Sequence, residues 1–229
     1  MRLKEWSELP PQMQCEDVRP YYDILKRKKG SLLFKRLFDF IGALILLLLL
    51  SPVFLVLAIL IKKDSAGPIF FRQVRVTQYG REFRIFKFRT MVANAEKLGT
   101  QVTIEQDPRI TKVGAMIRRC RLDEIPQLLN ILTGDMSFVG TRPEVPKYIA
   151  QYSPEMLATL LLPAGVTSVA SIKYKDEDRI LADSENPDQV YIKEILPSKM
   201  KINLESIKQF NLFCEVKLLF ETILSVIKG

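Results

Sequence analysis

The segment from Phe40 to Ile61 carries no charged residue, and a Ser-Pro pair, Ser51 and Pro52, lies at its middle. Its length matches the roughly 20 apolar residues that a helix needs to cross a hydrocarbon core about 30 Å thick. The segment begins too late in the chain, and is too long, for a cleaved signal peptide. It therefore predicts a membrane element.

Basic residues flank this segment on both sides, and such residues concentrate on the cytoplasmic face of membrane proteins. The proline removes one helical hydrogen bond, and the serine hydroxyl can bond to a freed carbonyl. Two interpretations follow: a kinked helix that spans the bilayer, and a helix-break-helix that re-enters on the cytoplasmic face. The flanking residues are Lys26, Arg27, Lys28, Lys29, Lys35, Arg36, Lys62 and Lys63.

The composition restricts the chemistry. The net charge of +8 predicts an anionic partner: phospholipid headgroups, a phosphorylated substrate or nucleic acid. The chain has no His, which excludes Ser-His-Asp, Cys-His and His-ligated metal mechanisms. Cys15, Cys120 and Cys214 are far apart and form no CxxC pair, so neither a zinc site nor a disulfide framework is indicated. We expect the chemistry on the reducing, cytoplasmic side.

Two β-rich runs surround Gly80 and predict a hairpin. In the second run, Phe83, Ile85, Lys87 and Arg89 alternate and would share one face. Lys87 and Arg89 would then emerge from a hydrophobic base. The alternative is a solvated basic edge strand.

Residues 107 to 143 are the densest in charge and in helix signals. We expect one helix to open at Pro108 and to end near Cys120. A second helix should follow Pro126 and stop at Gly134.

Asp123 and Glu124 come just before this second helix. One interpretation is a helix cap, since acidic residues suit a helix start. The other is a catalytic role. The free backbone N–H groups and the positive dipole end at a helix N-terminus lower a carboxylate's pKa and keep it ionised as a nucleophile or magnesium ligand. Carboxylates, a hard cation and guanidinium groups suit phosphoryl transfer without His. The nearby arginines are Arg118, Arg119, Arg121 and Arg142.

Together, the stretches "KFRTM" and "DPRITKVGAMIRRCRLDEIPQLLNILTGDMSFVGTRP" and the Pro-broken apolar segment resemble the bacterial monotopic phosphoglycosyl transferases. The resemblance runs from about Phe34 to about Val169. In that family a nucleotide-activated sugar, usually a UDP-sugar, gives its phosphosugar to a polyprenol phosphate and UMP is released. The product begins a surface glycan or a glycoprotein glycan.

The resemblance assigns catalytic roles to the acidic pair. Asp123 matches the nucleophile that forms a covalent aspartyl-phosphosugar in a ping-pong scheme. Glu124 matches its partner, which is implicated in magnesium binding and in handling the acceptor. The expected cofactor is therefore Mg²⁺, with Asp123 and Glu124 as its ligands.

The resemblance also assigns phosphate-binding residues. Arg118 matches the arginine before the acidic pair, and Arg142 with Pro143 matches an Arg-Pro motif whose cation holds phosphate. Lys87 and Arg89 fall on a motif near the diphosphate or the acceptor phosphate. The chain departs from the pattern at Arg121, often Ser, in "GTRP", usually Gly-Pro-Arg-Pro, and in "PAGVTS", where a final Gly is replaced by Ser168.

Ser51 and Pro52 match the pair that breaks the membrane helix into a re-entrant hairpin. The lipid acceptor requires the site to lie at the membrane surface, close to Lys62 and Lys63. Taken with the acidic pair and the basic flanks, this favours re-entrance over spanning.

We expect an α+β fold, mostly helical, in three parts: an N-terminal basic arm (1–33), a re-entrant membrane hairpin (34–63) and a cytosolic catalytic domain (64–229). The arm would lie on an anionic surface or be poorly ordered. Apolar spacing from Asn203 to Ile227 predicts one or two amphipathic helices, packed in the core or lying in the headgroups. Asp176, Glu177 and Asp178 would belong to the site or to a solvated surface.

The leading hypothesis is a magnesium-dependent phosphoglycosyl transferase on the cytoplasmic face of the bacterial inner membrane, in a minimal form without an added multi-pass domain. Its partners would be a UDP-sugar, polyprenol (undecaprenyl) phosphate and membrane phospholipids. The alternative is a catalytically silent membrane-anchored scaffold or lipid-binding protein. No nucleic-acid-binding motif is recognised, and donor choice rests on loops outside the motifs.

Overall fold

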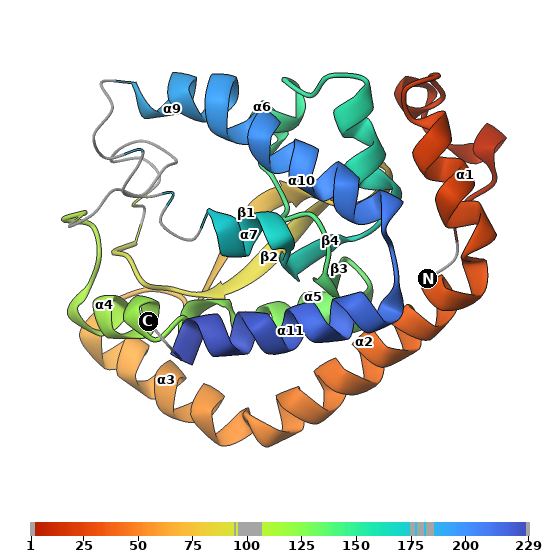
Figure 1. Cartoon of the computed structure of the whole chain (residues 1–229). Coiled ribbons are helices and arrows are strands. Elements are labelled where there is room, and N and C mark those ends of the chain that lie inside the picture. The colour runs from red at the N-terminus through yellow and green to blue at the C-terminus, as the bar shows by residue number, and fades with distance from the viewer. Residues whose placement is uncertain are drawn as a thin grey trace.

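Most of the chain is helical, and a long bent pair of helices underlies the rest. The computed structural model describes residues 3–93, 95, 107–174, 177, 181 and 186–227. Helices α2 (Lys29–Leu49) and α3 (Ser51–Asp64) bow along one side of the molecule, below two small sheets (Figure 1). The expected helical character and β-hairpin are thus confirmed. The expected domain boundary at residue 33 falls inside α2.

The bend between α2 and α3 lies at the Ser-Pro pair. The two helices meet at an angle of 61°. Among the described residues no single helix is long and apolar enough to cross a bilayer. The two helices of the bent pair together have the required length and apolar composition. Pro52 has no N–H to donate to the Leu48 carbonyl, and the Ser51 hydroxyl donates to that carbonyl instead, at 2.8 Å. The Ser-Pro pair therefore produces the break.

The predicted hairpin around Gly80 is confirmed. Strands β1 (Phe70–Val76) and β2 (Glu82–Phe88) are antiparallel, with Phe70 opposite Phe88. A tight turn over Gln78–Gly80 joins them, and Gly80 has a positive φ of 75°. The hairpin carries Lys87 on its second strand, one residue before the strand ends.

A second, parallel sheet consists of β3 (Met136–Val139) and β4 (Ala164–Thr167). The backbone just after β3 passes very close to β4, since a Cβ on Gly165 would lie 2.1 Å from the Gly140 backbone nitrogen. Gly140 N–H donates to the Thr167 carbonyl at 3.0 Å. This close approach fixes the start of the loop that carries Arg142.

Short helices connect and cover the two sheets. The helix expected from Pro108 instead begins at Lys112, because the Thr111 hydroxyl caps it by accepting from Gly114 N–H at 3.0 Å. Gly134 ends α5 with a φ of 88°, as predicted. The elements are α4 (Lys112–Arg119), α5 (Gln127–Thr133), α6 (Pro146–Ile149), α7 (Val169–Lys173), α9 (Pro187–Val190), 3₁₀ turns at Leu122–Glu124 and Glu155–Leu161, and a π-helical turn at Tyr191–Ile195.

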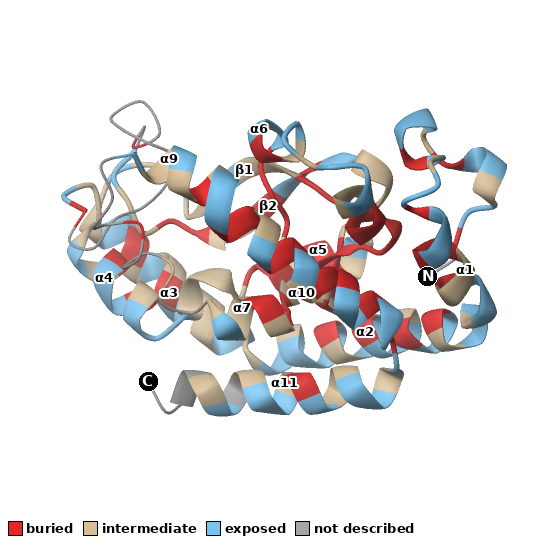
Figure 2. Cartoon of the chain, turned by 45° about the horizontal axis from the view of Figure 1, so that its top comes forward, coloured by how far each residue is buried: buried red, intermediate tan, exposed pale blue. Residues whose placement is uncertain are grey.

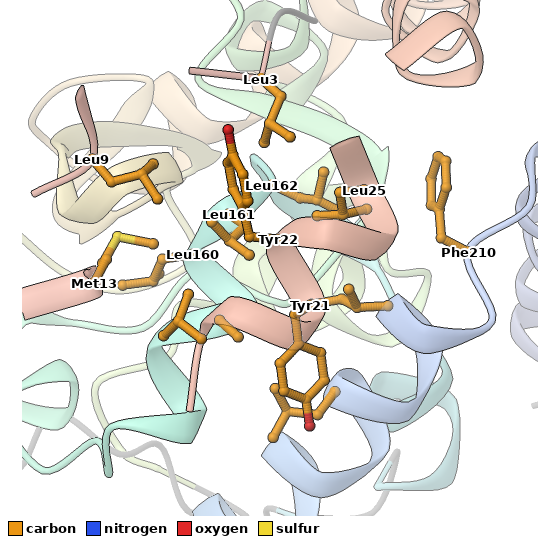
Figure 3. Close-up of a cluster of buried hydrophobic side chains, with 14 of the residues drawn as sticks. Leu3, Leu9, Met13, Tyr21, Tyr22, Leu25, Leu160, Leu161, Leu162 and Phe210 are labelled. Carbon is orange, nitrogen blue, oxygen red and sulfur yellow. The ribbon is translucent and has the colours of Figure 1, made fainter. Parts of the chain in front are cut away.

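The N-terminal segment is packed into the protein, which excludes the expectation of a poorly ordered tail for its described part. Two 3₁₀ turns (Trp6–Glu8 and Pro11–Met13) lead into α1 (Arg19–Arg27). Figure 3 shows apolar side chains of this segment gathered against residues of the 3₁₀ turn before β4 and against Phe210. The buried set includes Leu3, Leu9, Met13, Tyr22, Leu25, Leu160, Leu161 and Phe210.

Buried polar contacts fix one side of α2 to β3 and α11. Lys35 is only 2% exposed; its ammonium pairs with Glu215 at 2.6 Å and donates to the Val139 carbonyl at 3.0 Å. Asp39 accepts from the Ser137 hydroxyl at 2.7 Å. Lys35, expected as part of the basic flank, is therefore an internal anchor, because its charge is already neutralised within the protein.

The two C-terminal helices have different environments. Helix α10 (Leu196–Lys208) packs one face in the core, whereas α11 (Leu212–Ile227) lies beside α2 with much of its surface exposed (Figures 1 and 2). Of the one or two helices predicted from Asn203 to Ile227, two are present; the first begins earlier, at Leu196, and packs in the core. Large apolar side chains exposed on α2, α3 and α11 include Leu33, Phe34, Leu37, Ile45, Leu48, Leu49, Leu55, Val56, Phe213, Phe220 and Leu224.

Candidate active site

A polar pocket of about 310 Å³ opens where α4, β2, the loop after β3 and α10 converge. Asp123 and Glu124 line it from the 3₁₀ turn between α4 and α5. Their side chains do not cap α5, whose start has no side-chain cap hydrogen bond. The structure therefore disfavours the helix-cap interpretation. The remaining wall is Arg75, Lys87, Arg118, Arg121, Arg142, Pro143, Glu144, Tyr148, Ser171, Tyr174, Glu177, Leu181, Tyr191 and Lys199.

Glu124 is held between two cations. Its Oε1 pairs with Lys87 Nζ at 2.9 Å, and its Oε2 accepts from Arg142 at 3.0 Å, with a second bond from the same guanidinium to Oε1. Burial by itself would raise the pKa of Glu124, but Arg142 and Lys87 outweigh it and hold that pKa well below its usual value. Glu124 is thus an ionised and positioned carboxylate.

Asp123 is in a different state. Among the described residues its side chain makes no ion pair, although Lys87 and Arg118 are close enough to act on its charge. Burial raises the pKa of the Asp123 carboxyl above its usual value; Lys87 opposes that rise and the Glu124 charge adds to it. Asp123 is therefore a carboxylate whose oxygens remain available to a substrate.

Buried contacts fix the cations that hold Glu124. Asn130 on α5 docks to β2, since its Oδ1 accepts from Phe86 N–H at 2.8 Å and its Nδ2 donates to the Arg84 carbonyl at 3.1 Å. These bonds lie just before Lys87. Arg75 donates to the Pro143 carbonyl at 3.0 Å and so supports the Arg142 turn. Sequence reasoning missed both residues, because an isolated Asn or Arg gives no signal of a contact across elements.

Arg89 does not reach the pocket, which corrects the expectation that it shares a face with Lys87. Strand β2 ends at Phe88, so the alternation stops before Arg89. The Arg89 guanidinium is buried and donates to the carbonyls of Ser65 at 2.6 Å and Ala66 at 2.9 Å. It binds the chain leaving α3, and its role here is to connect the helix pair to the hairpin.

A second polar cluster lines the opposite wall and was not foreseen. Lys199 on α10 is nearly buried and pairs with Glu177 at 2.8 Å. The Tyr191 hydroxyl donates to Glu144, two residues after Arg142. Of the acidic run expected at the site or on the surface, Glu177 lines the pocket, whereas Asp176 and Asp178 lie outside the described residues.

The structure thus brings together five of the six polar site residues expected from the sequence: Lys87, Arg118, Asp123, Glu124 and Arg142. Pro143 lines the same pocket, and Ser51 and Pro52 are at the helix break. A family model described as "Bacterial sugar transferase" matches residues 30–229. The chain belongs to the bacterial sugar transferase family.

Curated relatives agree with this assignment. A UDP-N-acetylgalactosamine-undecaprenyl-phosphate N-acetylgalactosaminephosphotransferase of Aeromonas hydrophila is 35% identical over 203 residues, which cover 85% of this chain and 44% of the relative. A UDP-glucose:undecaprenyl-phosphate glucose-1-phosphate transferase of Escherichia coli is 35% identical over 233 residues, covering 100% of this chain and 45% of the relative. An undecaprenyl-phosphate glucose phosphotransferase of Komagataeibacter xylinus is 34% identical over 210 residues, covering 87% and 37%.

The chain spans less than half the length of these three relatives. The match to this sugar transferase family begins at residue 30, so it includes α2 from its second residue, all of α3 and every residue of the pocket. The helical pair and the acidic pocket therefore lie within the matched region.

Proposed function

We propose that this bacterial sugar transferase moves a sugar 1-phosphate from a UDP-sugar to undecaprenyl phosphate, with Asp123 as the nucleophile. The observation that carries the proposal is the asymmetry of the acidic pair. The Glu124 carboxylate is paired with Lys87 and Arg142. Asp123 lines the same pocket but makes no ion pair within the described residues. The names of the relatives support the donor and acceptor classes.

In the first step an Asp123 carboxylate oxygen attacks the phosphorus that bears the sugar. A new P–O bond forms to Asp123, the bond to the bridging oxygen of the diphosphate breaks, and UMP leaves with that oxygen. Two anions repel each other, so the cations around the pocket have to neutralise the diphosphate before attack. Lys87 and Arg142, both paired with Glu124, line the pocket for that task.

In the second step an oxygen of the lipid phosphate attacks the same phosphorus. The bond to Asp123 breaks, the carboxylate returns to its starting form, and a polyprenyl-diphosphate-sugar leaves. Glu124 stays ionised through both steps, because Arg142 and Lys87 keep its pKa low. It orients these two cations toward the phosphates.

The proposal includes Mg²⁺ as a cofactor held by the acidic pair. Within the described residues no group of three or more acidic or sulfur ligands could hold a metal by itself. Mg²⁺ commonly uses one or two carboxylates together with substrate phosphates and water, so Asp123 and Glu124 suffice when a diphosphate is bound. When bound there, the ion would neutralise charge on the diphosphate.

We further propose that α2 and α3 enter the membrane and return on the cytoplasmic face. The bend of 61° and the exposed apolar surface of the two helices support this, as does the pair of exposed lysines at the end of α3. Accessibility labelling tests it with Gly30→Cys and Lys63→Cys in a background without Cys15, Cys120 and Cys214. Labelling of both cysteines from the cytoplasmic side is expected; labelling from opposite sides would exclude re-entrance.

A panel of UDP-sugars assayed for UMP release in the presence of undecaprenyl phosphate tests the activity. At least one donor should release UMP only when Asp123 is intact. If the protein is instead a catalytically silent membrane-anchored scaffold, no donor releases UMP. The panel also identifies the sugar, which the pocket residues do not specify.

A further inference from the structure

The guanidinium groups of two arginines at the edge of the pocket have no hydrogen bond or ion pair within the described part of the chain. These are Arg118 and Arg121, and both line the wall next to Asp123. The other cations of the pocket are engaged: Lys87 and Arg142 with Glu124, Lys199 with Glu177, and Arg75 with Gln73 and the Pro143 carbonyl. Two guanidinium groups are therefore available to an anion.

The backbone at Arg121 is unusual for a residue with a side chain. Helix α4 ends at Arg119, and Arg121 then adopts a left-handed conformation with φ 54° and ψ 25°. Its N–H donates to the Arg118 carbonyl at 2.9 Å, which fixes this turn. Glycine is the usual residue at such a position, because a Cβ is strained there. Strained residues of this kind concentrate at functional sites, which suggests a functional role for the Arg121 side chain.

Arg121 reaches the pocket from the side of the membrane hairpin. Helix α4 packs on α3, with Ile117 buried among Leu57 and Ile61, and Val113 N–H donates to the Asp64 carboxylate at 3.0 Å. Figure 1 shows α4 next to α3, and α10 on the other side of the sheets. Helix α4, which leads into Arg118 and Arg121, therefore lies along α3, the helix beside which a lipid-borne anion would arrive.

We infer that Arg121, with Arg118, binds the phosphate monoester of the lipid acceptor in a subsite separate from the Lys87–Arg142 pair. This inference rests on the proposed function. The acceptor phosphate is an anion that has to approach a phosphosugar on Asp123 with Glu124 close by. Two guanidinium groups supply forked donors to its oxygens and reduce that repulsion. The phosphate head also distinguishes the acceptor from the uncharged prenol.

The test compares Arg121→Gly and Arg121→Lys with the control Arg119→Gln. Gly suits the left-handed backbone, so the turn and the fold persist while the guanidinium is lost. Arg119 is exposed at the end of the same helix and does not line the pocket. Loss of charge-assisted hydrogen bonds in Arg121→Gly should raise KM for undecaprenyl phosphate about tenfold. The KM for the donor should change much less. The KM of Arg121→Lys for undecaprenyl phosphate should lie between those of Arg121→Gly and the parent protein, and Arg119→Gln should have the KM values of the parent protein.

Direct binding separates this inference from the proposed function. Calorimetry with a short-chain prenyl phosphate should show about tenfold weaker binding to Arg121→Gly, whereas binding to phosphatidylglycerol vesicles should be unchanged. Equal changes in both KM values, no change in either, or weaker vesicle binding would each overturn the inference. Because binding needs no turnover, the result holds even if no donor in the panel releases UMP, an outcome that counts against the proposed function alone.

Discussion

Two clusters of opposite charges, one beside the bent helix pair and one in the pocket, have different roles. In the helix-pair cluster, which consists of Lys35, Asp39 and Glu215, the lysine lies between the two carboxylates. The Ser137 hydroxyl and the Phe138 N–H donate to Asp39. The Lys35 and Asp39 side chains are each only 2% exposed. Every charge there has a partner within the protein, so the cluster fixes α2 to β3 and α11.

The pocket cluster is incomplete by comparison. Lys87 and Arg142 both bind Glu124, whose side chain is 20% exposed, and Asp123 next to it has no such partner among the described residues. A fully paired cluster holds structure, whereas a carboxylate left unpaired beside cations can react with an incoming phosphate. The two clusters are connected, since Lys35 binds the Val139 carbonyl and the loop to Arg142 begins there.

The largest effect is expected from Asp123→Asn. The amide cannot act as the nucleophile, so UMP release should fall on the order of 10⁴-fold or more, and no phosphosugar adduct should form. Mass spectrometry of protein incubated with donor alone measures the adduct. Asp135→Asn is the matched control, because Asp135 is a half-buried carboxylate outside the pocket, paired with Arg81. An adduct on the Asn variant would exclude the assigned role of Asp123.

A substitution in the helix-pair cluster should lower the stability of the fold. Lys35→Met leaves Asp39 and Glu215 buried without their cation, which should lower the free energy of unfolding by about 3–5 kcal/mol. Thermal and denaturant unfolding in detergent, followed by circular dichroism, measures this. Lys62→Met is the control, since Lys62 is exposed at the end of the same helix pair. If the two variants were equally stable, Lys35 would not be an anchor.

A smaller effect is expected at Arg142. Arg142→Lys keeps the positive charge but loses the two-pronged contact with Glu124, so kcat/KM should fall about 10²-fold while stability changes little. Arg81→Lys, a change at an exposed arginine that pairs with Asp135, is the matched control. A stability loss as large as that of Lys35→Met would place Arg142 with the structural charges instead.

The sequence was sufficient for features that depend on local signals. The Ser-Pro break, the hairpin turn at Gly80 and the helix stop at Gly134 each follow from backbone chemistry within a few residues. The acidic pair and its cations were found through motifs whose order and spacing are specific. These predictions therefore needed no knowledge of distant contacts.

The features that were missed depend on contacts between distant parts of the chain. Arg89 follows Lys87 by two residues, but the strand ends between them and the side chain turns to α3. Lys35 looked like a membrane flank because its partner, Glu215, lies 180 residues away. Lys199 meets Glu177 and Glu144 only in the folded chain. Local patterns cannot specify such pairings.

The smallest effect concerns pH and distinguishes the two carboxylates of the pocket. Burial raises the pKa of Asp123 from its usual 3.8, whereas the pKa of Glu124 stays low. Attack needs ionised Asp123, so adduct formation should fall in a single acidic limb above pH 3.8 as Asp123 gains a proton. Glu124 keeps its charge across that range and adds no second limb.

Lys87→Met sharpens this test, because Lys87 opposes the raised pKa of Asp123. Without that charge the protonated form of Asp123 is favoured further, and the acidic limb should move to higher pH. Lys62→Met should leave the limb in place, and circular dichroism at each pH separates loss of activity from unfolding. The stabilising contribution of ionised Glu124 is present above its usual pKa of 4.5 and is lost only as the pH falls through its lowered value, so unfolding should not produce the limb. A limb that moved to lower pH in Lys87→Met would contradict the assignment of the limb to Asp123.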